Sequence, residues 1–145
     1  MRTGWKHEPQ ATGGCQCGAL RHAAPAGPAR STVWPCRMRQ RATGNALAPL
    51  LDVLSDTTGW SGTPAEWASS DIALRGFCNI CGTPVYYRST DTSEIMAGTP
   101  SPAVRFRPDA PCAIERRQPR LGLLPTLPFH PTPAGPAVTS HQSPE

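Results

Sequence analysis

The fold of this chain is decided by two short stretches, Gly13-Gly14-Cys15-Gln16-Cys17-Gly18 and Phe77-Cys78-Asn79-Ile80-Cys81-Gly82. Each stretch supplies two closely spaced thiols and then a glycine, which lets the backbone turn tightly around a metal ion. Two such pairs, far apart in the chain, provide the four sulfur ligands of a tetrahedral zinc site. We therefore predict a zinc ion bound by Cys15, Cys17, Cys78 and Cys81.

A site with four protein ligands leaves no open position for water or substrate, so this zinc is expected to be structural. Structural zinc contributes roughly 10–16 kcal/mol in small peptides, more than the net stability of most small domains. Two alternatives stay open at this point. The six cysteines could form a disulfide framework, or the four paired cysteines could be buried and reduced without a metal.

Length and composition favour one small, mainly β domain. The chain has 145 residues, enough for about one domain with a modest core. Its 18 prolines and 13 glycines favour short strands and turns over a helical bundle.

The charge pattern gives no indication of a nucleic-acid or membrane partner. The net charge is +4, but no run of basic residues with interleaved aromatics is present. No apolar stretch is long enough for a signal-peptide core or a membrane span. We expect a cytoplasmic protein, and in that reducing compartment clustered cysteines more often bind metal than form disulfides.

Short alternating segments predict a series of strands; residues 46–53 are instead an apolar run that fits strand or helix by periodicity, and Pro49 and its short length favour a strand. Strands are expected at residues 19–22, 46–53, 66–69, 72–77, 85–88, 94–97 and 113–115. The second cysteine pair would then lie at the end of a hairpin.

Three regions are expected along the chain. Residues 1–11 form an N-terminal extension and residues 12–128 the zinc-binding domain. Residues 129–145 form a disordered tail, because its prolines leave too little apolar surface to offset the entropy of ordering the chain.

Four blocks of sequence together resemble a known family. They are Gly13 to Arg21, Arg41-Ala42-Thr43-Gly44, Gly76 to Pro84, and Ile114 to Leu121. They are similar to the glutathione-dependent formaldehyde-activating enzyme family, which also includes centromere protein V. The resemblance implies a Mss4-like β fold, a structural zinc on the two outer cysteine pairs, and a second zinc on a central Cys-x-Cys-x-x-Cys motif.

The family's chemistry, as the resemblance implies it, is that of a carbon–sulfur lyase. Formaldehyde or a related small aldehyde condenses with glutathione or another small thiol. The second zinc has three protein ligands and an open position, the arrangement that polarises a carbonyl or activates a thiol.

This chain departs from the family at the central motif. With Thr43 and Gly44 fixing the register, the three cysteine positions fall on Trp34, Cys36 and Arg39. The indole nitrogen of Trp34 offers no lone pair, and Arg39 carries a permanent positive charge. Cys36 is the remnant of the catalytic site, so we expect the second zinc to be absent and the lyase activity impaired.

Two other interpretations remain beside an impaired enzyme: a non-catalytic, zinc-stabilised binding or scaffold module, and a degenerating gene product.

No spacing brings another soft donor beside Cys36; the candidates are His7, His22 and Cys112. The acidic residues Glu66, Asp71 and Glu94 show no pairing typical of acid–base chemistry. Arg37, Arg39 and Arg41 could attract a carboxylate such as that of glutathione, but a solvated basic loop is the preferred interpretation.

Overall fold

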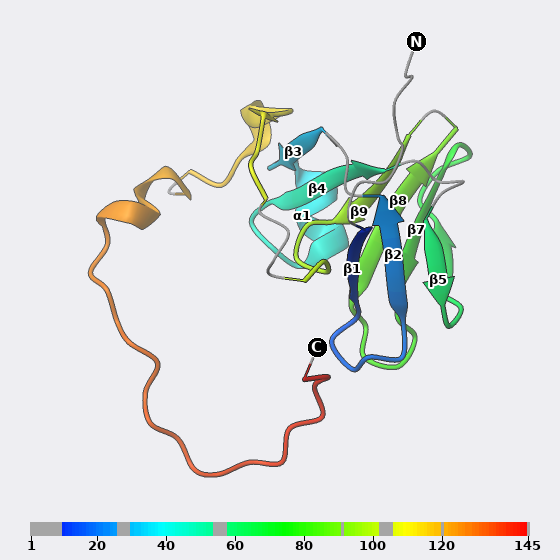
Figure 1. Cartoon of the computed structure of the whole chain (residues 1–145). Helices are drawn as coiled ribbons and strands as arrows, with labels where there is room; N and C mark the ends of the chain where they lie inside the picture. Colours follow the sequence, from blue (N-terminus) through cyan, green and yellow to red (C-terminus); the bar gives the residue numbers. More distant parts are fainter. Residues whose placement is uncertain are drawn as a thin grey trace.

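Strands dominate the computed structural model, which describes residues 10–25, 30–53, 58–90, 92–101, 106–119 and 121–144 (Figure 1). This confirms the predicted mainly β class. A three-stranded sheet has the order β1 (Gln10–Gly14), β2 (Arg21–Pro25), β5 (Gly59–Ser61). A seven-stranded sheet has the order β10 (Ala110–Pro111), β3 (Ser31–Trp34), β4 (Ala48–Val53), β9 (Ser93–Met96), β8 (Pro84–Ser89), β7 (Ala73–Phe77), β6 (Ala65–Ala68).

Six of the ten described strands overlap a predicted segment: β2, β4, β6, β7, β8 and β9. β7 and β8 form the expected antiparallel hairpin. The strand predicted at residues 113–115 is wrong. Ala113 has a left-handed backbone with φ of 53°, which ends an extended segment, and Ile114–Arg116 form a 3-10 helix, η2.

One face of the large sheet carries the apolar core. Leu51, Ile95 and Tyr86 are successive partners across β4, β9 and β8. They form a buried cluster together with Cys15, Leu20, Cys78 and Val85. Trp60 of β5 packs against this cluster with its ring centroid 5.5 Å from that of Tyr86. The burial of this apolar surface joins the two sheets.

The opposite face of the large sheet carries charged side chains. Arg75, Tyr87, Glu94 and Asp52 are successive partners across β7, β8, β9 and β4, and we call these four residues the polar row. Directly paired residues share a face and neighbours along a strand alternate, so the polar row lies opposite the Leu51 and Ile95 side of the sheet.

A short helix, α1 (Arg37–Thr43), packs on the polar row beside β4 and β9 (Figure 1). It ends at Gly44, whose φ of 64° suits a glycine. Gln40 anchors it, because its Nε2 donates to the carbonyls of Pro35 at 2.7 Å and Arg116 at 3.0 Å. The interpretation of Arg37, Arg39 and Arg41 as a solvated basic loop is wrong in that they lie on a helix and Arg39 is buried, although Arg37 and Arg41 are exposed.

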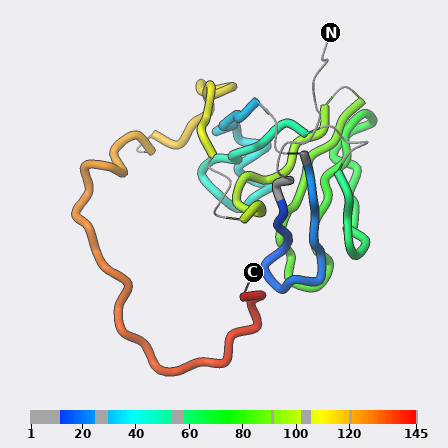
Figure 2. Tube along the Cα trace, viewed as in Figure 1, coloured from blue at the N-terminus to red at the C-terminus, as the bar shows by residue number. Residues whose placement is uncertain are grey.

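The C-terminal segment leaves the body of the molecule and returns to it (Figure 2). After the 3-10 helix η3 (Leu121–Thr126), the described residues 127–144 contain no helix or strand, and Phe129 is exposed. Near its end, the Ser143 amide donates to the Gln16 carbonyl at 2.7 Å. In the part of the chain that the structure describes, none of the helices is long and apolar enough to span a bilayer.

Candidate functional site

The four predicted zinc ligands lie together. Cys15 and Cys17 follow β1, and Cys78 and Cys81 follow β7. Their four sulfur atoms lie within 4.8 Å of one another, with 3.6 Å between those of Cys15 and Cys17 and 3.8 Å between those of Cys17 and Cys78. Sulfur atoms bound tetrahedrally to zinc at about 2.3 Å are separated by roughly 3.8 Å. The cluster thus has the spacing of a metal site.

Two similar turns position these thiols. In the first, the Gly18 amide donates to the Cys15 carbonyl at 3.1 Å; in the second, the Gly82 amide donates to the Cys78 carbonyl at 2.8 Å. Gly18 and Gly82 have φ of 83° and 78°, a region that disfavours side chains. This is the tight turn predicted from the glycine that follows each pair.

Hydrogen bonds distribute negative charge unevenly over the cluster. Burial opposes ionisation of Cys81, but hydrogen bonds from Thr83 and Cys17 outweigh it and lower the pKa of Cys81 to about 6. For Cys17, a hydrogen bond from the Ala19 amide is outweighed by burial and the three neighbouring thiols, which raise its pKa to about 11. Thiolate is the form that binds metal, so Cys81 is prepared for a cation near neutral pH.

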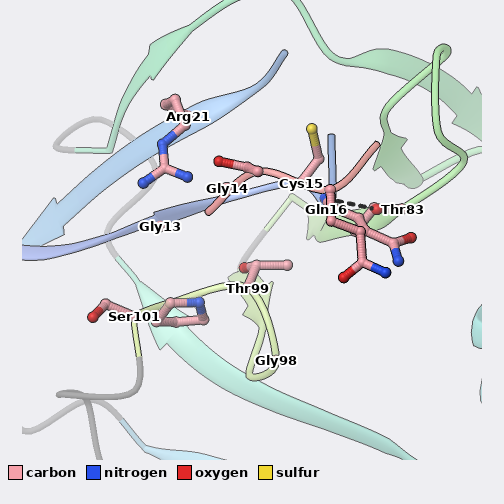
Figure 3. Close-up of a pocket in the computed structure, with 12 residues that line it drawn as sticks. Gly13, Gly14, Cys15, Gln16, Arg21, Thr83, Gly98, Thr99 and Ser101 are labelled. Carbon is pink, nitrogen blue, oxygen red and sulfur yellow. Dashed lines mark hydrogen bonds between the residues drawn. The ribbon is translucent and has the colours of Figure 1, made fainter. Parts of the chain in front are cut away.

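A pocket of about 330 Å³ adjoins the cluster (Figure 3). Figure 3 shows Arg21 on one side of Gly13 and Thr99 and Ser101 on the other. A side chain at Gly13 would collide with the Thr99 carbonyl, so glycine is required for this close approach of β1 to the loop after β9. The C-terminal residues Gln142 and Ser143 also line the pocket.

The central motif surrounds the start of α1. Trp34 ends β3, Cys36 is the residue before the helix and makes no capping side-chain hydrogen bond, and Arg39 lies in the first turn. Arg39 is only 7% exposed. The position that the family resemblance gives to a third cysteine therefore holds a buried guanidinium.

The Arg39 guanidinium is enclosed by two aromatic rings and a carboxylate. Its central carbon lies 4.0 Å from the ring centroid of Tyr87 and 5.0 Å from that of Trp34. Its Nη2 lies 3.6 Å from Oε2 of Glu94. Aromatic faces and a carboxylate both stabilise a cation, so this enclosure fits a permanent positive charge.

Hydrogen bonds fix the enclosing side chains. The Trp34 Nε1 donates to Thr32 Oγ1 at 3.0 Å, and that hydroxyl donates to Glu94 Oε1 at 3.4 Å. Burial, with a contribution from Asp52, raises the pKa of Glu94, although Arg39 acts in the opposite direction.

The other candidate donors do not complete a central metal site. Among the described residues, the outer cysteines form the one cluster of three or more His, Cys, Asp or Glu ligands, and it includes neither Cys36 nor Cys112. His22 is buried and its Nε2 lies 3.1 Å from Thr99 Oγ1, as expected of a structural histidine. His7 lies outside the described residues.

Sequence reasoning missed the polar row as part of the site. Arg75 and Glu94 are 8% and 5% exposed. Arg75 lies against the ring of Tyr87, and Glu94 lies against Arg39. Their alternation with apolar residues could have indicated one shared face, but their pairing depends on strand order. Glu94 is the ion-pair partner of Arg39, and Glu66 is that of Arg88; the sequence had indicated only that these acids show no pairing typical of acid–base chemistry.

Comparison with known proteins places these features in a family. No curated protein matches the sequence significantly. The sequence model of the glutathione-dependent formaldehyde-activating enzymes matches residues 10–115, from β1 to η2, and includes both cysteine pairs and α1. Because this match covers well over half of the sequence, the chain belongs to the glutathione-dependent formaldehyde-activating enzyme family.

Proposed function

We propose that this chain is a zinc-stabilised member of the family that binds a small ligand and does not perform the zinc-dependent condensation of formaldehyde with glutathione. Zinc would be held by Cys15, Cys17, Cys78 and Cys81, since four thiolates in a tetrahedral cluster are typical of structural zinc. The zinc ion would link the turn after β1 to the turn after β7, and it would have no open coordination position for a substrate.

One observation carries the proposed loss of catalysis: the guanidinium of Arg39 lies between Trp34, Tyr87 and Glu94. A second zinc at this place would meet a fixed positive charge, and Cys36 alone would supply a thiolate of the motif. A guanidinium has no vacant coordination position, so it cannot polarise an aldehyde as a Lewis acid or bind a thiolate by coordination.

Metal content and activity together test the proposal. Protein produced in zinc-supplemented medium should contain one zinc ion per chain by native mass spectrometry. It should accelerate the reaction of formaldehyde with glutathione little beyond the uncatalysed background. Two zinc ions per chain with turnover would contradict the proposal, and turnover with a single zinc would transfer catalysis to Cys36.

A further inference from the structure

Arg75, a member of the polar row, is a buried cation with incomplete hydrogen bonding. Its Nη1 and Nη2 atoms are both buried without a hydrogen-bond partner among the described residues, and the same holds for Nη1 of Arg39. Its central carbon lies 5.1 Å from the ring centroid of Tyr87. This aromatic contact attracts the charge but cannot satisfy two planar nitrogen groups that donate at their edges.

A second guanidinium lies close to these nitrogens. Burial and the charge of Arg39 lower the pKa of the Arg75 guanidinium, and Tyr87, Cys36 and Glu94 act in the opposite direction. Glu94 interacts with Arg39, and burial favours its neutral form. A buried charged donor without an acceptor destabilises the fold, so an added anion that accepts its hydrogen bonds would remove that penalty.

A cavity beside Arg75 can admit such an anion. It has a volume of about 410 Å³, within the range of small-molecule sites. Arg75 and Arg41 supply positive charge to its wall, and Trp67, Phe77 and Met96 supply apolar surface. The combination of guanidinium groups and apolar surface fits an anion with an apolar body.

We propose that this cavity binds a small carboxylate with an apolar body, the carboxylate accepting hydrogen bonds from Arg75 with support from Arg41, and the body lying against Trp67 and Met96. Because the Arg75 nitrogens are closed to solvent in this structure, the proposed contact requires the Arg75 side chain to turn toward the cavity. This inference deepens the proposed function. It rests on the part of that proposal in which the central site binds a small ligand and holds no second zinc.

Benzoate is the probe, and benzamide is its neutral control of nearly the same shape. Titration calorimetry on the zinc-loaded full chain should show binding of benzoate and at least about tenfold weaker binding of benzamide. Benzoate should also raise the melting temperature in a concentration-dependent manner. Equal binding of the two compounds, or binding of neither, would overturn the proposal, and this comparison needs no variant.

Variants locate the site. Arg75→Met should weaken benzoate binding roughly 10- to 100-fold, because a charged hydrogen-bonding group is lost. Arg41→Met, at an exposed position, should weaken it about threefold. Arg117→Met removes the same charge from an exposed position in the C-terminal part and should leave benzoate binding unchanged. Unchanged binding in Arg41→Met together with weaker binding in Arg117→Met would place the anion elsewhere.

Zinc content measured on the same samples separates the two proposals. Benzoate binding with two zinc ions per chain would contradict the proposed function and leave the carboxylate site standing. One zinc ion per chain without benzoate binding would contradict the carboxylate site alone.

Discussion

The ring of Tyr86 lies directly over Gly76, its partner across the β7–β8 ladder, and occupies the space of a side chain at that position. Tyr86 is also a member of the core cluster, and its hydroxyl donates to Glu66. The ring connects the core beside the cysteines to the edge strand β6, so its position depends on glycine at residue 76.

Gly76→Ala should therefore destabilise the fold by about 1–3 kcal/mol, since the added methyl group forces the Tyr86 ring out of the core. Urea denaturation monitored by fluorescence measures the change. Gly98→Ala is the matched control, because a methyl group there meets no atom within 4 Å. Equal effects of the two substitutions would show that the ring position is unimportant.

Cys78→Ser should remove zinc and lower the melting temperature by on the order of 10 °C or more, because the metal is expected to couple to folding. Differential scanning calorimetry and elemental analysis measure the two effects. Cys112→Ser, at a partly buried thiol outside the cluster, should retain the metal and most of the stability. A melting temperature that Cys78→Ser does not change would mean that the cluster is not structural.

Trp34→Cys and Arg39→Cys together should raise the zinc content from one to two ions per chain. The double variant restores three thiolates with Cys36 and removes the guanidinium that repels a dication. Either single variant should bind the second zinc weakly. Should the double variant still hold one ion, the geometry around Pro35, rather than the ligand set, would exclude the second zinc.

Glu94→Gln should change how stability depends on pH. The pKa of Glu94 is raised in the folded state, so this residue contributes stability that is complete below its unfolded pKa and is lost as pH rises through the folded value. The glutamine variant should lack this loss. The unfolding free energies of wild type and variant are compared across the pH range between the unfolded and folded pKa of Glu94. Their difference separates the effect of Glu94 from effects of acid on the cysteines. A difference independent of pH would contradict the raised pKa of Glu94.

The sequence predicted those strands and turns whose local residue pattern reflects their place in the folded domain. β4 and β8 were predictable because they carry apolar residues that lie in the core, Leu51 in β4 and Val85 and Tyr86 in β8. The cysteine cluster was predictable because both pairs carry their own turn glycines. β1 was missed because its two glycines give no alternation; Gly13 permits the close approach of Thr99 and Gly14 that of Leu20.

The central site was harder to predict for a different reason. α1 shows no apolar period, because its buried residues are Arg39 and Gln40 and Met38 is exposed. The helix is held by Gln40, which donates to the carbonyls of Pro35 and the distant Arg116. The pairing of Arg39 with Glu94 depends on how β9 lies beside β4, which no local pattern contains.

The Arg39 guanidinium makes the charge at the central motif independent of the metal supply. A side-chain cation cannot be removed by a chelator or exchanged for copper or iron, whereas ions at a thiolate cluster can be. The sheet face under α1 would keep its charge during zinc starvation, while the region around Cys15 and Cys78 would loosen. Two regions of one small domain would thus differ in their dependence on the cell's zinc.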